Sequence, residues 1–185
     1  MSEGRYFAYG HYAYEIFWTS CLYPEHSHVT SGGSPTPLTL KQEAAWRSYL
    51  RAHALLVRQL DQDLRVAHRM TLVTYDALVQ LPEAPGQRLG MKDLAAALVY
   101  SASGLTRVVD CLERDGFARR ETDPADRRAS LIVLTPQGLA ALRQAWPTHL
   151  HGVTRHFSDH LTPRQDGTIT AVCRAITTGL RHLDS

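Results

Sequence analysis

Residues 101–136 read SASGLTRVVDCLERDGFARRETDPADRRASLIVLTP, and this stretch decides the fold. Its first part carries apolar residues at the i, i+3, i+4 and i+7 positions of one helix face, namely Leu105, Val108, Val109 and Leu112. An amphipathic α-helix buries such a stripe against a core. Ser101 can cap this helix, and Gly116 stands where a helix ends in a left-handed residue. The pattern therefore predicts a helix from Ser101 to Asp115.

The second part of the stretch predicts a β-hairpin. Residues 117–122 and 130–134 are short strand candidates, and a polar turn over residues 123–129 separates them. Thr135 and Pro136 then open another helix, with the threonine as its N-cap and the proline in its first turn. A helix followed by a hairpin with a charged tip is typical of a DNA-reading helix and its wing.

The residues before this stretch predict the first half of a helix-turn-helix unit. Apolar residues at three- and four-residue steps predict a long helix over residues 39–68. Thr71 can cap a second helix, which we expect the Pro-Glu-Ala-Pro-Gly stretch of residues 82–86 to end. Residues 88–91 are long enough for one short strand, and residues 92–99 predict a short helix.

The predicted order is two helices, a strand, two helices, two strands and two helices, the last of which starts at Thr162 and Pro163. This is a mainly α fold with a small β-hairpin wing. Residues 71–134 form its winged helix-turn-helix DNA-binding domain, between helical segments at 38–70 and 135–185. Residues 1–37 are an aromatic-rich N-terminal extension that ends in a Ser/Gly/Pro linker.

Composition excludes some classes of protein and supports none by itself. The net charge of +2 is too small to argue for nucleic acid, and residues 101–130 carry six arginines and six acidic residues. No apolar run is long enough to span a bilayer, and the N-terminus lacks a signal-peptide pattern, so we expect a cytoplasmic protein without membrane contact. Three cysteines, odd in number and far apart, argue against a disulfide framework and a structural zinc site.

The predicted second helix carries a face suited to the major groove of double-stranded DNA. Its N-terminal residues are the ones that meet base edges in such a unit. Ser101, Ser103 and Gly104 permit a close approach to the duplex, and Thr106 and Arg107 can donate hydrogen bonds to phosphates or bases. Each has a simpler interpretation: Ser101 as a helix cap, and Arg107 as a phosphate contact that reads no sequence.

The predicted wing supplies a second contact. Arg127 and Arg128 lie at its tip, and an extended arginine there can enter the minor groove, where the negative potential is strong. We expect Asp126 to orient this arginine pair rather than to touch DNA, because phosphates repel a carboxylate.

These segments resemble the MarR family, over about residues 40–183. The resemblance implies an obligate homodimer whose dimerisation region is formed by 38–70 and 135–185, and a repressor of a pseudo-palindromic operator. It also implies release by a phenolic or other small aromatic effector, and no cofactor. The matching DNA-binding residues are Ser101, Ser103, Thr106, Arg107, Asp126 and Arg128. The matching blocks are residues 93–95, 101–110, 112–120, 126–129 and 134–138.

The resemblance places an effector pocket between the first, second and fifth helices. His53, Tyr75 and Trp146 are candidates for its lining by position alone. Core packing is the alternative for all three, and we favour it for Tyr75 and Trp146.

Three other functions stay open. Cys111 lies on the DNA-reading helix away from its buried stripe, so its oxidation could weaken DNA binding; Cys173 falls in an apolar pattern and is expected in the core. A winged helix can also serve protein partners alone. A metal-dependent enzyme would use the histidines of the fifth helix, but no nucleophile, base and orienting group come together, so we expect neither an enzyme nor a metal site. These histidines are His149, His151, His156 and His160.

Overall fold

The structure is a computed structural model that describes residues 37–98, 102–124, 126 and 128–181. Contacts between Cα atoms divide the chain into two units, residues 1–43 and residues 44–185. The second unit holds the predicted DNA-binding elements.

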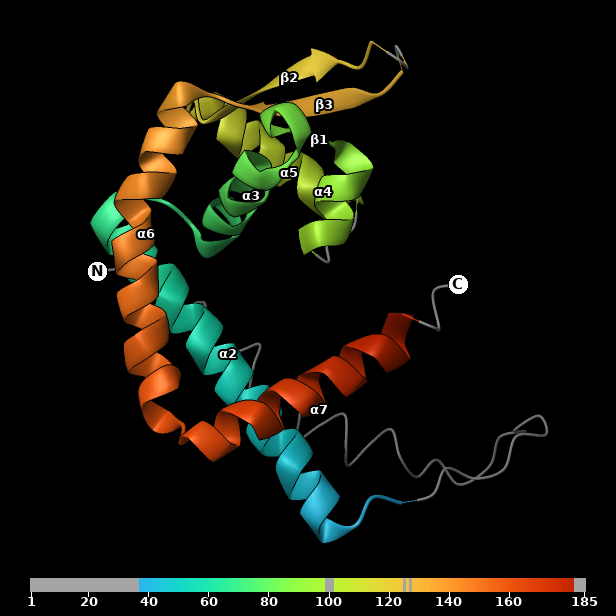
Figure 1. The fold of residues 1–185 in the computed structure, drawn as a ribbon, viewed down its shortest axis with the longest axis vertical. Helices are drawn as coiled ribbons and strands as arrows, with labels where there is room; N and C mark the ends of the chain where they lie inside the picture. The colour runs from blue at the N-terminus through green and yellow to red at the C-terminus, as the bar shows by residue number, and fades with distance from the viewer. Residues whose placement is uncertain (1–36, 99–101, 125, 127, 182–185) are drawn as a thin grey trace, which may run out of the picture. The chain divides into compact units, whose positions relative to one another are not determined.

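The observed elements follow the predicted order, and the mainly α fold with a small antiparallel sheet is confirmed (Figure 1). The α3 helix ends at Glu83, within the stretch of residues 82–86 that was predicted to stop it. The predicted cap Ser101 lies outside the described residues. The elements are α2 (Leu40–His68), α3 (Leu72–Glu83), η1 (Pro85–Gln87), β1 (Arg88–Gly90), α4 (Met91–Leu98), α5 (Ala102–Arg114), β2 (Ala118–Thr122), β3 (Ser130–Leu134), α6 (Pro136–His156), η2 (Ser158–His160) and α7 (Pro163–Arg181).

The sheet has the strand order β1-β3-β2, and both pairs are antiparallel. Ile132 in the central strand pairs with Leu89 of β1 and with Arg120 of β2. Ile132 and Leu134 of β3 belong to the hydrophobic core, and Ile132 is fully buried. The sheet therefore fixes the hairpin to the helical core.

The predicted stripe of α5 forms part of that core. Leu105, Val109 and Leu112 are fully buried, while Val108 packs at the edge. Removing an apolar side chain of this size from water contributes about 2 kcal/mol. The opposite face of α5 is consequently held outward. Leu64, Tyr75, Leu78, Leu81, Leu94 and Ile132 complete the most deeply buried set.

The end of α5 is joined to the start of α6. Gly116 has a φ of 71°, and the N–H of Phe117 donates to the carbonyl of Leu112 at 2.8 Å, which closes the helix as predicted. The Thr135 hydroxyl donates to the Gly116 carbonyl at 2.7 Å. A Cβ on Gly138 would lie 1.9 Å from the Phe117 carbonyl oxygen, so only glycine allows this approach.

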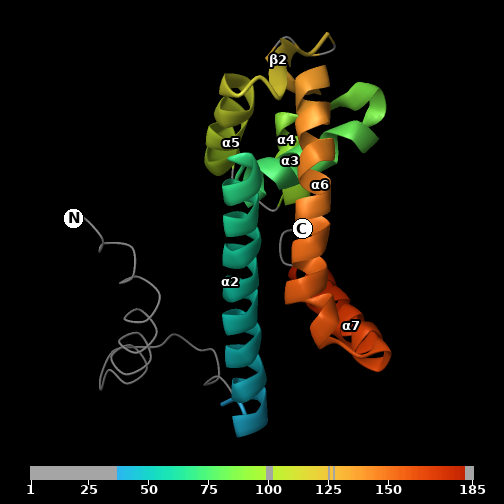
Figure 2. The same ribbon diagram turned by 90° about the vertical axis from the view of Figure 1, so that its left-hand side faces the viewer.

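Helices α2 and α6 run side by side in opposite directions (Figure 2). Two hydrogen bonds connect them. His68 bonds to the Thr148 hydroxyl at 2.8 Å, and His156 bonds to the Asp63 carboxylate at 3.2 Å. Gly152 lets the helices approach closely, because a Cβ there would lie 2.7 Å from Leu60.

Residues 170–180 of α7 are exposed along their whole length. No helix within the described residues is long and apolar enough to cross a membrane.

Candidate nucleic-acid interface

The outward face of α5 carries the predicted DNA-contacting residues that the structure describes. Thr106 and Arg107 are exposed, and Gly104 is half-buried near the start of the helix. Since the buried stripe holds the other side of α5 against the core, these residues face solvent. Ser101 lies outside the described residues, and so does the side chain of Ser103.

Most of the charged residues around α5 are paired with each other. The Arg120 guanidinium in β2 donates to the Asp110 carboxylate at 2.7 Å and to Glu113, and its backbone N–H donates to Glu113 at 2.8 Å. These contacts hold the pKa of Arg120 above its usual value, with the hydrogen bond to Asp110 as the main cause.

Two further arginines are paired locally. Arg114 donates to Asp115 at 2.9 Å, and Arg119 donates to Glu121 at 2.9 Å. Four of the six acidic residues of this stretch, Asp110, Glu113, Asp115 and Glu121, are therefore neutralised within the protein.

Among the described residues of this stretch, Arg107 and Arg128 are the arginines that are not paired in this way. Within the part of the chain that the structure describes, neither guanidinium has a carboxylate partner, and both residues are exposed. The stretch is balanced in total charge, yet its described residues present unpaired positive charge at Arg107 and at Arg128. The sequence could not show this, because it gives the number of charges and not their pairing.

The wing tip is shaped by Asp126. Its carboxylate accepts a hydrogen bond from the backbone N–H of Arg128 at 2.9 Å, and the Ala129 N–H donates to its carbonyl at 2.9 Å. The acid therefore acts on the turn that carries Arg128. Arg127 lies outside the described residues.

Known proteins share the sequence pattern and the fold of this chain. The model of the MarR family matches residues 70–130. Sco3205, a MarR family transcriptional regulator from Streptomyces coelicolor crystallised in complex with DNA, is 36% identical, with a TM-score of 0.77 over 80% of this chain and 93% of that chain. AbsC from the same organism is also 36% identical, with a TM-score of 0.75 over 80% of this chain and 99% of that one. The chain belongs to the MarR family.

Sequence relatives of this MarR-family chain are named as transcriptional regulators. YkoM of Bacillus subtilis, an uncharacterised regulator, is 33% identical over 85 residues, which cover 46% of this chain. The match spans 55% of YkoM, so the chain covers about half the length of that relative. A putative regulatory protein for the hcr operon of Thauera aromatica is 27% identical over 68% of this chain and 74% of its own length.

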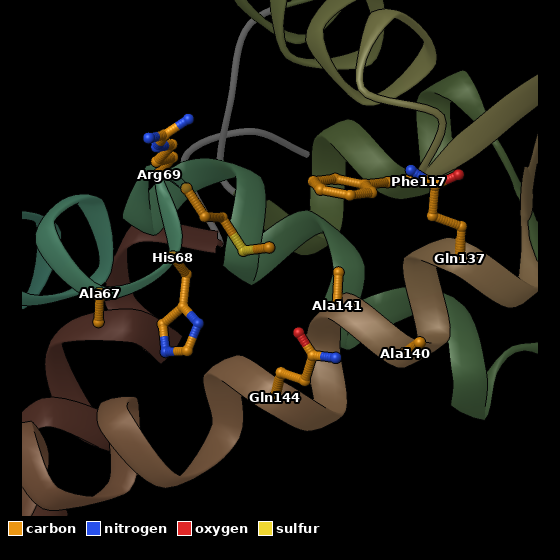
Figure 3. A pocket seen from close by; sticks show the side chains of 9 residues that line it. Ala67, His68, Arg69, Phe117, Gln137, Ala140, Ala141 and Gln144 are labelled. Atoms are coloured by element: carbon orange, nitrogen blue, oxygen red, sulfur yellow. The ribbon is translucent and has the colours of Figure 1, made fainter.

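A cavity of about 460 Å³ lies between the end of α2 and the start of α6. The ring of Phe117 lies on one side of it and His68 on the other, with Ala141 and Gln144 of α6 between them (Figure 3). Met70 and Gln137 also line it, so the cavity offers both apolar surface and hydrogen-bonding groups.

The three predicted pocket residues lie apart from this cavity. Tyr75 is buried in the core, with its ring 4.4 Å from that of His149. His53 is exposed and stacks on Tyr49, and Trp146 is 51% exposed. Core packing, the favoured alternative, describes Tyr75 correctly but is wrong for Trp146 in the single chain.

Tyr75 and His149 are in ring contact, and each contributes one buried polar atom. The Tyr75 hydroxyl and the His149 Nδ1 are both buried and lack a partner within the described structure. Burial, and then the neighbouring Asp76, raises the pKa of Tyr75 to about 12, and burial lowers the pKa of His149. Burial also raises the pKa of Asp76 to about 6. In all three groups, burial shifts the protonation equilibrium toward the uncharged form.

The groups behind the alternative functions are placed as follows. Cys111 is half-buried on α5. Cys173 is exposed, so its predicted place in the core is wrong for the single chain, where nothing described covers the apolar side of α7. The described residues contain no group of three or more histidine, cysteine or acidic side chains that could hold a metal.

The sequence did not predict the pairing of Arg120 with α5. Glu113 and Arg120 are seven residues apart, with a helix end and a turn between them, so neither helical nor strand spacing relates them. A carboxylate on the outward face of the helix beside a strand arginine was the available signal.

Asp76→Asn tests the buried cluster through pH. The raised pKa means that the folded protein resists ionisation of Asp76, so the destabilisation is fully present above about pH 6 and absent below about pH 4. We expect the variant to melt at a higher temperature than wild type near pH 7.5, by a margin that shrinks as the pH falls through 6 and vanishes below 4. Asp159→Asn, at an exposed carboxylate, is the control; an equal gain in both variants would contradict the assignment.

Proposed function

We propose that this chain is a sequence-specific DNA-binding transcriptional regulator that places α5 in the major groove and the β2–β3 hairpin against the minor groove. The observation that carries the proposal is the free, exposed positive charge of Arg107 and Arg128 in a stretch whose other described arginines are paired. A relative at 36% identity, crystallised with DNA, supports it.

The geometry suits this role. Arg107 lies in the second turn of α5, the part of a recognition helix that reaches base edges. Guanidinium groups bind guanine edges and phosphates through two parallel hydrogen bonds, and a free guanidinium needs no ion pair broken first. Arg128 stands on a turn held by Asp126, which suits insertion into a narrow groove.

Arg107→Ala and Arg128→Ala are each expected to weaken binding to the DNA flanking the gene by about 10- to 100-fold, because each removes one arginine that binds the duplex. The plot of the logarithm of the binding constant against the logarithm of the salt concentration should become less steep, by about one for each phosphate that the variant no longer binds. Fluorescence anisotropy across a salt series measures both quantities.

Arg143→Ala is the matched control, since it removes an exposed arginine of α6. Unchanged affinity in both Arg107→Ala and Arg128→Ala would refute the placement of the interface. Absence of DNA binding in the wild-type chain would favour the alternative of a winged helix that serves protein partners alone.

The proposal includes a homodimer. Helix α7 carries Val172, Ile176 and Leu180 on one face, each about half exposed, and Trp46 and Tyr49 of α2 are also about half exposed. Contiguous apolar surface of this kind is covered in stable proteins. A second copy is the partner that supplies matching helices, and it would set two α5 helices about one turn of DNA apart on a pseudo-palindromic operator.

Ile176→Asp is expected to shift the protein to monomers and to abolish operator binding at concentrations where wild type binds, because it puts a charge into the proposed interface. Sedimentation velocity measures the mass. Ala171→Asp places the same charge on the other side of α7 and should stay dimeric. Monomeric wild-type protein, or a dimeric Ile176→Asp variant, would contradict this interface.

The proposal also includes repression that a small aromatic effector releases. BpsR of Bordetella bronchiseptica, which shares the fold at 21% identity, has its DNA binding regulated by 6-hydroxynicotinic acid. CouR of Rhodococcus jostii, at the same identity, is bound to p-coumaroyl-CoA. The cavity beside Phe117 is the proposed site, and Gln137 in its wall also donates to the Asp115 carbonyl at 3.0 Å. An occupant would therefore press on the junction between α5 and α6.

We expect 6-hydroxynicotinic acid or p-coumaric acid to weaken operator binding by wild type about tenfold, the usual size of such coupling. Ala141→Phe, which fills the cavity, should bind DNA normally and lose this response. Anisotropy titrations with and without each acid measure it. If neither acid changes wild-type affinity, or if Ala141→Phe responds fully, the proposed site is wrong.

A further inference from the structure

Arg120 of β2 is directly opposite the buried Ile132 of β3, and its side chain meets two carboxylates of α5 that lie one helical turn apart. The Arg120 side chain is 31% exposed, and the backbone N–H of Arg120 also donates to Glu113. Backbone and side chain of one residue thus hold the same face of the helix.

Stability alone does not account for this arrangement. Exposed ion pairs contribute little to folding, and Asp110 is 57% exposed. The hairpin is already held by the β2–β3 pairing and by the corner at Gly116 and Thr135. The cluster therefore has a consequence elsewhere.

That consequence concerns Arg107. Asp110 lies three residues after Arg107 on the same exposed side of α5, a spacing at which opposite charges pair. The Asp110 carboxylate is instead bound to Arg120 at 2.7 Å, and the Arg107 guanidinium has no acidic partner among the described residues. Arg120 thus binds the Asp110 carboxylate, which Arg107 would otherwise be placed to bind.

We infer that Arg120 is a positioning residue for DNA binding, which sequesters Asp110 and Glu113 and so leaves Arg107 free for the duplex. The inference rests on the proposed function. Without Arg120, Asp110 would pair with Arg107 and hold its guanidinium away from the duplex. Arg120 acts through Arg107 and need not touch DNA.

Arg120→Gln is expected to weaken operator binding about tenfold, the reduction expected when one arginine no longer binds the duplex. Adding Asp110→Asn to this variant should restore most of the affinity, because no carboxylate is then left to capture Arg107. Asp110→Asn alone should bind as wild type does. In the Arg107→Ala background, Arg120→Gln should cause little further weakening.

Anisotropy at fixed salt measures the affinities, and circular dichroism with urea unfolding of the free protein verifies that each variant is folded. Failure of Asp110→Asn to restore binding would overturn the inference, since Arg120 would then contact DNA itself or act only through the fold. Wild-type affinity in Arg120→Gln would also overturn it. If the wild-type chain binds no DNA, the proposed function fails and the inference with it.

Discussion

Three consecutive backbone carbonyls, in the turn that follows α5, accept hydrogen bonds from residues at the start of α6. The Gln137 amide donates to Asp115, and the Thr135 hydroxyl donates to Gly116 and Phe117. Gly138 permits the contact because it has no Cβ. Helix ends need such partners, and here one junction supplies them while it also closes the β2–β3 hairpin. The same contacts therefore fix the orientation of α5, the base of the β2–β3 hairpin and the start of α6.

This junction determines which charged residues around α5 can pair with each other. With α5 and β2 fixed to each other, Arg120 reaches Asp110 and Glu113, and Arg114 and Arg119 bind acidic neighbours. Within the described part of the chain, Arg107 on the helix and Arg128 on the wing have no carboxylate partner. We infer that these ion pairs contribute little to stability and mainly determine which arginine side chains stay unpaired on the surface.

The same junction relates the DNA-binding elements to the rest of the chain. Helix α6 leads from it along α2, to which it is bound by His68 and His156, and then into the exposed α7. The cavity beside Phe117 lies where these two parts meet. In our proposal a second copy covers α7, and an effector acts at the junction; the two events would then be mechanically related through α6.

The sequence by itself determined the elements, because their signals are local. The Leu105–Leu112 stripe, the caps at Thr71 and Thr135 and the stop at Gly116 depend on residues within a turn or two of each other, and all appear where predicted. Only the tertiary structure decided the pairings across elements: Arg120 with Asp110, Tyr75 with His149, and His156 with Asp63. The last two pairs join residues more than 70 positions apart, which no periodicity relates. For the same reason the sequence suggested His53, Tyr75 and Trp146 for an effector pocket, whereas the cavity that we propose for the effector is lined by His68, Phe117 and Gln144.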